Sequence, residues 1–146
     1  MNLLLSSKID SSQLIIENYK EWISELDFIL DEISIFEELV NSHFIELCSF
    51  DLYNKSKKLI HQLEFNEIDV NNLKSEIYTQ QKYLSLFLES NNINRKDEFI
   101  LKYYEINETK YSYMNNFKDL KKDTYSLIKE ILIRNKQKKL INNDKI

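Results

Sequence analysis

The stretch from Ile15 to Leu47 constrains the fold most strongly, because its apolar residues repeat every seven positions at alternating spacings of four and three. One series is Tyr19, Leu26, Ile33, Val40 and Leu47. The other is Ile15, Trp22, Ile29 and Phe36, with His43 where an apolar residue is expected. This spacing is typical of a helix that packs lengthwise against other helices. A further row beside this seam (Ile16, Ile23, Leu30 and Phe44) widens the apolar stripe enough for two neighbouring helices.

The residues that are missing support the same fold class. The chain of 146 residues contains no Gly and no Pro, and it also lacks Ala. Hairpin turns and helix C-caps that depend on Gly are therefore disfavoured, and turns must use Asn, Asp or Ser. Ala, Gly and Pro codons are GC-rich, so an AT-rich bacterial genome explains the composition without reference to function.

The apolar pattern predicts an all-α fold, an elongated antiparallel up-down-up bundle of three long helices. The first helix is expected to begin near Asp10 to Ser12 and to end at about Cys48, and Ser49 or Asp51 is expected to cap the second, over 51–90. The third is expected to follow a cap at Asn92 or Asn94, with Asp97 and Glu98 in its first turn. We predict a single domain over 1–146 with frayed ends at 1–9 and 140–146.

The second helix has the weakest seam, because the run from Asn66 to Asn72 is polar and Gln80 also falls on a core position. A break near Asn71 would give a four-helix bundle instead. The seven-residue phase is the same before and after this run, whereas an inserted loop normally shifts the phase. The sequence therefore favours a continuous helix.

Cysteine usage and hydropathy predict a cytoplasmic protein. The single cysteine, Cys48, excludes an intramolecular disulfide and favours a reducing compartment. No apolar run approaches the ~20 residues of a membrane span, and the start of the chain lacks the pattern of a signal peptide. We expect no membrane partner.

The sequence offers little support for catalysis or for a metal site. Helical di-iron bundles use a Glu-x-x-His spacing, but Val40 precedes His43 and Lys58 precedes His61 at that distance. Cys48 lies near a helix C-terminus, which disfavours the reactive thiolate. We therefore expect no enzyme activity, no cofactor and no metal ion.

A small polar pocket is the one candidate binding site for a small ligand. If the helices pair across the two expected turns, His43 lies level with Ser56, and Thr124 lies one turn away. The alternative is that these polar residues specify the register of the bundle without binding anything.

Aromatic and basic residues alternate in the third helix, which raises the possibility of single-stranded nucleic-acid binding. The tyrosines are Tyr103, Tyr104, Tyr111, Tyr113 and Tyr125, and the lysines are Lys102, Lys110, Lys118, Lys121 and Lys122. Tyr103 and Tyr113, however, fall on the seam. The net charge of −4 and the presence of only two arginines also argue against this function.

We therefore favour a non-catalytic module for protein–protein interaction, with a homodimer as the preferred assembly and a heterologous protein as the alternative partner. Several apolar residues fall off the seams: Phe28, Phe65, Ile68, Tyr78, Leu86, Tyr104 and Ile133. Scattered singly, such residues are normal on a protein surface, whereas aligned ones form a docking face. Trp22, on the seam, is expected to be buried.

Overall fold

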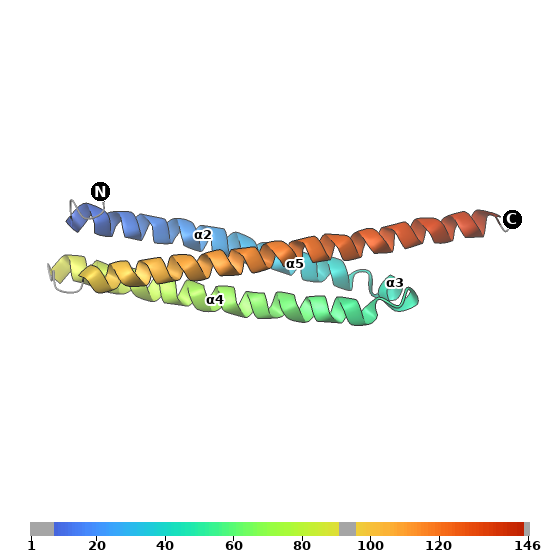
Figure 1. Cartoon of the computed structure of the whole chain (residues 1–146), viewed down its shortest axis with the longest axis horizontal. Coiled ribbons are helices and arrows are strands. Elements are labelled where there is room, and N and C mark those ends of the chain that lie inside the picture. The colour runs from blue at the N-terminus through green and yellow to red at the C-terminus, as the bar shows by residue number, and fades with distance from the viewer. Residues whose placement is uncertain (1–7, 91–95, 145–146) are drawn as a thin grey trace. The chain divides into compact units, whose positions relative to one another are not determined.

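The all-α prediction is confirmed by a computed structural model that describes residues 8–90 and 96–144. Within these ranges 96% of the residues are helical and none is in a strand. The helices are α2 (Lys8–Asn41), α3 (Phe44–Ser49), α4 (Tyr53–Ser90) and α5 (Lys96–Asp144), which Figure 1 labels. The three long helices match the three that the sequence predicts, and the short α3 is additional.

The predicted seam of the first helix is buried along its whole length. Eight seam residues of α2 are at most 7% exposed: Ile15, Tyr19, Trp22, Leu26, Ile29, Ile33, Phe36 and Val40. The prediction that Trp22 is buried is therefore confirmed. In the row beside the seam, Ile23 is buried, Ile16 and Leu30 are half-buried, and Phe44 is exposed.

The predicted ends of the first helix are wrong at both sides. Helix α2 already includes Lys8, so Asp10 and Ser12 lie inside it and do not cap it. At the other end, α2 stops at Asn41, and a two-residue turn, Ser42 and His43, separates it from α3. Ser42 Oγ donates a 2.7 Å hydrogen bond to the carbonyl of Leu39, and such local bonds compete with helical ones.

Helix α3 ends in a Schellman motif that uses Asp where Gly is usual. Asp51 has φ 58°, in the left-handed region. The amide of Leu52 donates to the carbonyl of Leu47 at 2.7 Å, and the amide of Asp51 donates to the carbonyl of Cys48 at 3.3 Å. Leu47 and Leu52 are both buried, which supplies the apolar contact of the motif. The expectation that Asp replaces Gly in turns is confirmed here.

Helix α4 is continuous, so the alternative with a break near Asn71 is wrong. Asn66 is 4% exposed, and Val70 and Leu73 continue the same buried seam. Neither Ser49 nor Asp51 caps α4, because Leu52 directly precedes it and accepts a 3.0 Å hydrogen bond from the amide of Ser56. The preserved seven-residue phase thus gives the correct prediction of continuity for α4.

Helix α5 has the predicted acidic first turn, with Asp97 and Glu98. The expected caps Asn92 and Asn94 lie outside the described residues. The helix continues to Asp144, past Leu140, where the sequence predicts fraying. Residues 136–143 are all exposed.

The chain divides into two compact units, each built from segments of the long helices. Unit 1 comprises Met1–Leu30 and Ile68–Met114, and unit 2 comprises Asp31–Glu67 and Asn115–Ile146. In unit 1, Asn18 contacts Tyr103 and Glu25 contacts Lys110, so α2 and α5 run in the same direction. The contacts of Glu76 with Lys102 and of Phe87 with Phe99 show that α4 runs in the opposite direction to α5.

An aromatic cluster fills part of the core of unit 1. The rings of Trp22 and Tyr103 are stacked, with centroids 4.9 Å apart and an interplanar angle of 18°. Tyr19 packs edge-on against Trp22 at 5.4 Å. Lys110, itself only 7% exposed, places its Nζ 4.7 Å from the centre of the Trp22 ring and 3.2 Å from Glu25 Oε2. Such a cation over an indole face is favourable where water is largely excluded.

In unit 2, aromatic contacts and one arginine hold α2, α3 and α5 together. Phe36 stacks on Phe117 and meets Tyr125 edge-on, with centroids 6.0 and 5.5 Å apart. The Nη1 atom of Arg134 donates a 2.9 Å hydrogen bond to the carbonyl of Phe50, and its Nη2 contacts Glu130 at 2.9 Å. Arg134 thereby satisfies a carbonyl at the end of α3, where a helix has orphan acceptors.

Candidate functional site

The three residues of the predicted polar pocket all lie in unit 2, but their hydrogen bonds are local. His43 lies in the turn before α3, and its Nδ1 is 2.8 Å from Glu46 Oε2. Ser56 Oγ donates to the carbonyl of Tyr53 at 2.7 Å, and Thr124 Oγ1 donates to the carbonyl of Leu120 at 2.8 Å. Both hydroxyls thus serve the backbone of their own helix. A pocket that joins the three side chains stays a prediction.

A small hollow lies next to two of these residues, between α4 and α5 of unit 2. Its volume is about 260 Å³, and its lining includes Lys55, Leu59, Asp123 and Leu127. Ser56 and Thr124 are sequence neighbours of this lining, and both are buried. Five of its seven lining residues are polar or charged (Lys55, Lys58, Gln62, Asp123 and Ser126), and neither Ser56 nor Thr124 is among them.

The described residues do not gather the side chains that bind metal ions. Residues 8–90 and 96–144 contain no group of three or more His, Cys, Asp or Glu side chains that could hold a metal ion. His61 is exposed on α4, with its Nδ1 3.8 Å from Glu64, and Cys48 is exposed on α3. None of the helices in this part of the chain is long and apolar enough to span a membrane.

Several lysines of the tyrosine- and lysine-rich helix are engaged with acidic side chains. Lys110 contacts Glu25, Lys102 contacts Glu76 and Glu105, and Lys121 donates to Glu32 at 2.8 Å. Hydrogen bonds from Lys102 to Glu76 and from Lys121 to Glu32 raise the pKa values of these two lysines. These ion pairs reduce the positive charge that α5 can offer to phosphates, while Lys118 and Lys122 remain exposed.

The tyrosines of α5 separate into two classes. Tyr103 and Tyr113 are half-buried, and Tyr103 also accepts a 2.7 Å hydrogen bond from Asn18 Nδ2. Burial, with Asp69 and Glu76 nearby, raises the pKa of Tyr113. Tyr104, Tyr111 and Tyr125 are 45, 64 and 53% exposed, on the outer face of the helix. The sequence pattern therefore combines core residues with surface residues.

The exposed tyrosines belong to a second, mostly apolar row on α5, which we call the outer stripe. Its spacings alternate between four and three, as in the buried seam. In unit 1 its apolar members are Ile100, Tyr104, Tyr111 and Met114, and in unit 2 they are Tyr125, Ile128 and Leu132. Three positions of the row are polar: Asn107 within the first segment, and Lys118 and Lys121 between the two segments.

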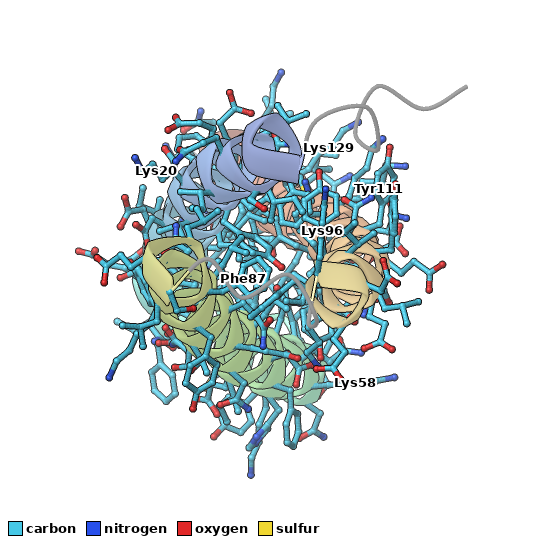
Figure 2. All side chains as sticks on the ribbon, turned by 90° about the vertical axis from the view of Figure 1, so that its left-hand side faces the viewer. Lys20, Lys58, Phe87, Lys96, Tyr111 and Lys129 are labelled. Carbon is cyan, nitrogen blue, oxygen red and sulfur yellow. The ribbon has the colours of Figure 1, made fainter. Side chains whose placement is uncertain are left out.

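Exposure differs systematically across the outer stripe. Ile100, Asn107, Met114 and Ile128 are half-buried, whereas Leu132, like the three exposed tyrosines, is more than 40% exposed. In Figure 2, Tyr111 lies at the periphery, while Phe87 lies among the helices. One seven-residue series of the stripe is thus half-buried beside the core, and the other is exposed to solvent.

Comparison of the chain with protein-family models, with curated proteins and with solved structures finds no match. The candidate function is therefore inferred from the side chains of this chain alone.

Exposed apolar residues are also aligned on the other two long helices. On α4, Phe65, Ile68, Tyr83 and Leu86 are 52–67% exposed and follow one another at spacings of three, fifteen and three, so they share one face, whereas Tyr78 lies on another. All seven apolar residues that the sequence places off the seams are exposed. On α5, Tyr104, Tyr111 and Tyr125 are spaced by multiples of seven, and the exposed Leu14, Phe28 and Ile35 of α2 are spaced in the same way.

Proposed function

We propose that the chain is a non-catalytic helical module that acts through protein–protein interaction, with a second copy of itself or another helical protein as partner. The observation that carries this proposal is the outer stripe of α5. Tyr104 and Tyr125 contact Tyr103 and Phe36 with their ring edges, yet both remain more than 40% exposed, as do Tyr111 and Leu132. A second row with the same spacing suits contact with a further helix.

The composition of the outer stripe also supports an interface. Tyrosine is enriched in protein–protein contacts, because its ring supplies a large rigid apolar area and its hydroxyl tolerates water before binding. Three of the seven apolar residues are exposed tyrosines, and one is methionine, which adapts to irregular partner surfaces. Scattered apolar residues need no explanation, but aligned ones on one helix face do.

The ion-pair contacts of the His and Lys side chains support a non-catalytic role. His43 pairs with Glu46, His61 lies near Glu64, and Lys102, Lys110 and Lys121 pair with carboxylates. A general acid or base must converge with other reactive groups on a shared site. These pairs involve different residues at separate positions along the helices.

Two matched variants test the interaction surface. Tyr111→Lys places a charge in the outer stripe, and Tyr78→Lys places the same charge on α4, where Tyr78 is 51% exposed. Sedimentation velocity over a series of protein concentrations should show that Tyr111→Lys abolishes self-association, while Tyr78→Lys associates like the wild type. Equal behaviour of both variants and the wild type would contradict the assignment of the interface to α5.

A further inference from the structure

A groove lies between the C-terminal end of α4 and the N-terminal end of α5. Its volume is about 870 Å³, more than three times that of the hollow next to Ser56. Pockets that bind small molecules usually measure about 300–1,000 Å³. The described residues that line the groove fall within Gln80–Ser90 and Glu98–Lys102, and both segments belong to unit 1. The groove is therefore built by one compact unit alone.

Three aromatic rings and one leucine form the apolar part of the groove. Tyr83 and Phe87 are four residues apart and so share a face of α4, with Leu86 beside them. Phe99 of α5 meets Phe87 with ring centroids 5.3 Å apart and an interplanar angle of 55°. Phe87 and Phe99 are half-buried, whereas Tyr83 and Leu86 are 53 and 52% exposed. Aromatic rings from both helices are thus accessible to a ligand in the groove.

The unpaired charges of the groove are acidic. Glu89 comes from α4 and Glu98 from α5, and both line the groove with exposed side chains. Among the residues that the structure describes, neither carboxylate forms an ion pair. Two negative charges therefore lie beside the aromatic rings, one on each side of the groove.

Lys102 also lines the groove, but acidic side chains outside the groove bind its ammonium group. Its Nζ contacts Glu76, and it lies 3.7 Å from Glu105 Oε2. The hydrogen bond to Glu76 is the main cause that raises the pKa of Lys102. Because Glu76 lies one turn before Gln80, this contact directs the ammonium away from the end of the groove near Phe87. Lys102 therefore does not neutralise Glu89 and Glu98.

We propose that this groove binds a small organic ammonium ion that carries an aromatic or branched apolar body. The faces of aromatic rings attract such cations, most strongly where water is partly excluded. Glu89 and Glu98 add electrostatic attraction, and the apolar body covers Leu86 and Phe87. An anionic ligand would meet the same two carboxylates at a cost. This inference goes beyond the proposed function, because neither a second copy nor a partner protein takes part in it.

Titration of the isotope-labelled full chain with benzyltrimethylammonium chloride, followed by heteronuclear NMR at constant ionic strength, tests the site. We expect saturable binding of one ion per chain with a Kd of about 1 mM or lower. The amide shifts should change most around Tyr83 and Phe99. Benzyl alcohol and benzenesulfonate keep the ring but lack the cation, so they should bind about fivefold more weakly or worse.

Matched charge variants test the role of the two carboxylates. Glu89→Gln combined with Glu98→Gln should weaken the binding of benzyltrimethylammonium about fivefold. The control combines Glu21→Gln with Glu108→Gln, which removes the same charge from exposed positions of unit 1 outside the groove. The control should bind the cation like the wild type.

A second pair of variants tests the aromatic contribution. Tyr83→Leu keeps an apolar side chain but removes the ring, and it should weaken cation binding about two- to fivefold. Tyr78→Leu makes the same change at a residue that is 51% exposed on another face of α4, and it should have no effect. Circular dichroism checks that all variants remain helical.

The outcomes that overturn this inference differ from those that concern self-association. Absence of saturation at millimolar concentrations, equal affinity for the three probes, or shift changes centred away from the groove would each refute the site. Equal weakening by the groove variant and its charge control would refute the role of Glu89 and Glu98. Sedimentation velocity of the wild type tests self-association separately, and a monomer that binds the cation leaves this inference intact.

Discussion

The amide of Leu52 donates a 2.7 Å hydrogen bond to the carbonyl of Leu47, and this bond is possible because Asp51 between them adopts φ 58°. A residue with a Cβ atom is strained in this region, although Asp tolerates it better than most. The chain has no Gly to place there.

Asp51→Gly should therefore stabilise the protein by about 0.5–1 kcal/mol, and Asp51→Val should destabilise it by roughly 1–2 kcal/mol. Urea unfolding monitored by circular dichroism measures both. The control is Asp69→Gly within α4, where the same replacement loses helix propensity and should not stabilise. Stabilisation at both positions would show that the backbone conformation of Asp51 is not the cause.

Trp22→Ala should destabilise the protein by about 3–5 kcal/mol, because Trp22 is 7% exposed and contacts Tyr19, Tyr103 and Lys110. The native fluorescence of this only tryptophan should resist quenching by iodide. If iodide quenched the native Trp22 fluorescence as fully as it quenches that of the unfolded chain, the burial of Trp22 would be contradicted.

Tyr19→Phe should leave stability at neutral pH unchanged or raise it by up to about 1 kcal/mol. The Tyr19 hydroxyl is buried and finds no hydrogen-bond partner among the described residues, so its removal loses no bond. Burial raises the pKa of Tyr19 above its ordinary value of 10.0, with smaller contributions from Tyr103 and Glu76.

This shift has a consequence at alkaline pH. Above pH 10.0 the unfolded state releases the Tyr19 proton while the native state retains it, so wild-type stability should fall as pH rises. The decline should be less steep in Tyr19→Phe. Parallel declines in denaturation series between about pH 9 and 11 would exclude Tyr19 as the group responsible.

Glu37→Gln should stabilise the protein at neutral pH by roughly 0.5 kcal/mol. Burial raises the pKa of Glu37 above 4.5, and the nearby Glu67 and Glu64 raise it further. The native state therefore binds this proton more tightly than the unfolded state, and the stability that it contributes is lost as pH rises through the native pKa. The two proteins should become equally stable below pH 4.5, and a difference that persists there would exclude ionisation as its cause.

The buried seams can be predicted from sequence because they depend on one strong regularity. Residues such as Trp22, Leu63 and Ile131 are buried where the seven-residue repeat places them. The same repeat does not predict the turn at Ser42 and His43. Leu47 keeps its place in the repeat and is buried, so the apolar pattern carries no sign that the helix stops before it.

The candidate interface is only partly predictable. The sequence identifies Tyr104 as an off-seam apolar residue, whereas Tyr111 and Tyr125 fall among lysines in a pattern that resembles nucleic-acid binding. Asn107, Lys118 and Lys121 interrupt the outer stripe, which hides its repeat in the sequence. The structure separates the half-buried Tyr103 and the paired Lys110 from the exposed tyrosines.

Self-association is the central claim of this account, and the molar mass in solution tests it most directly. Size-exclusion chromatography with light scattering, repeated at increasing micromolar concentrations, should show a rise from 17.7 kDa toward twice that value, 35.4 kDa. A mass that stays at 17.7 kDa at every concentration would contradict the homodimer.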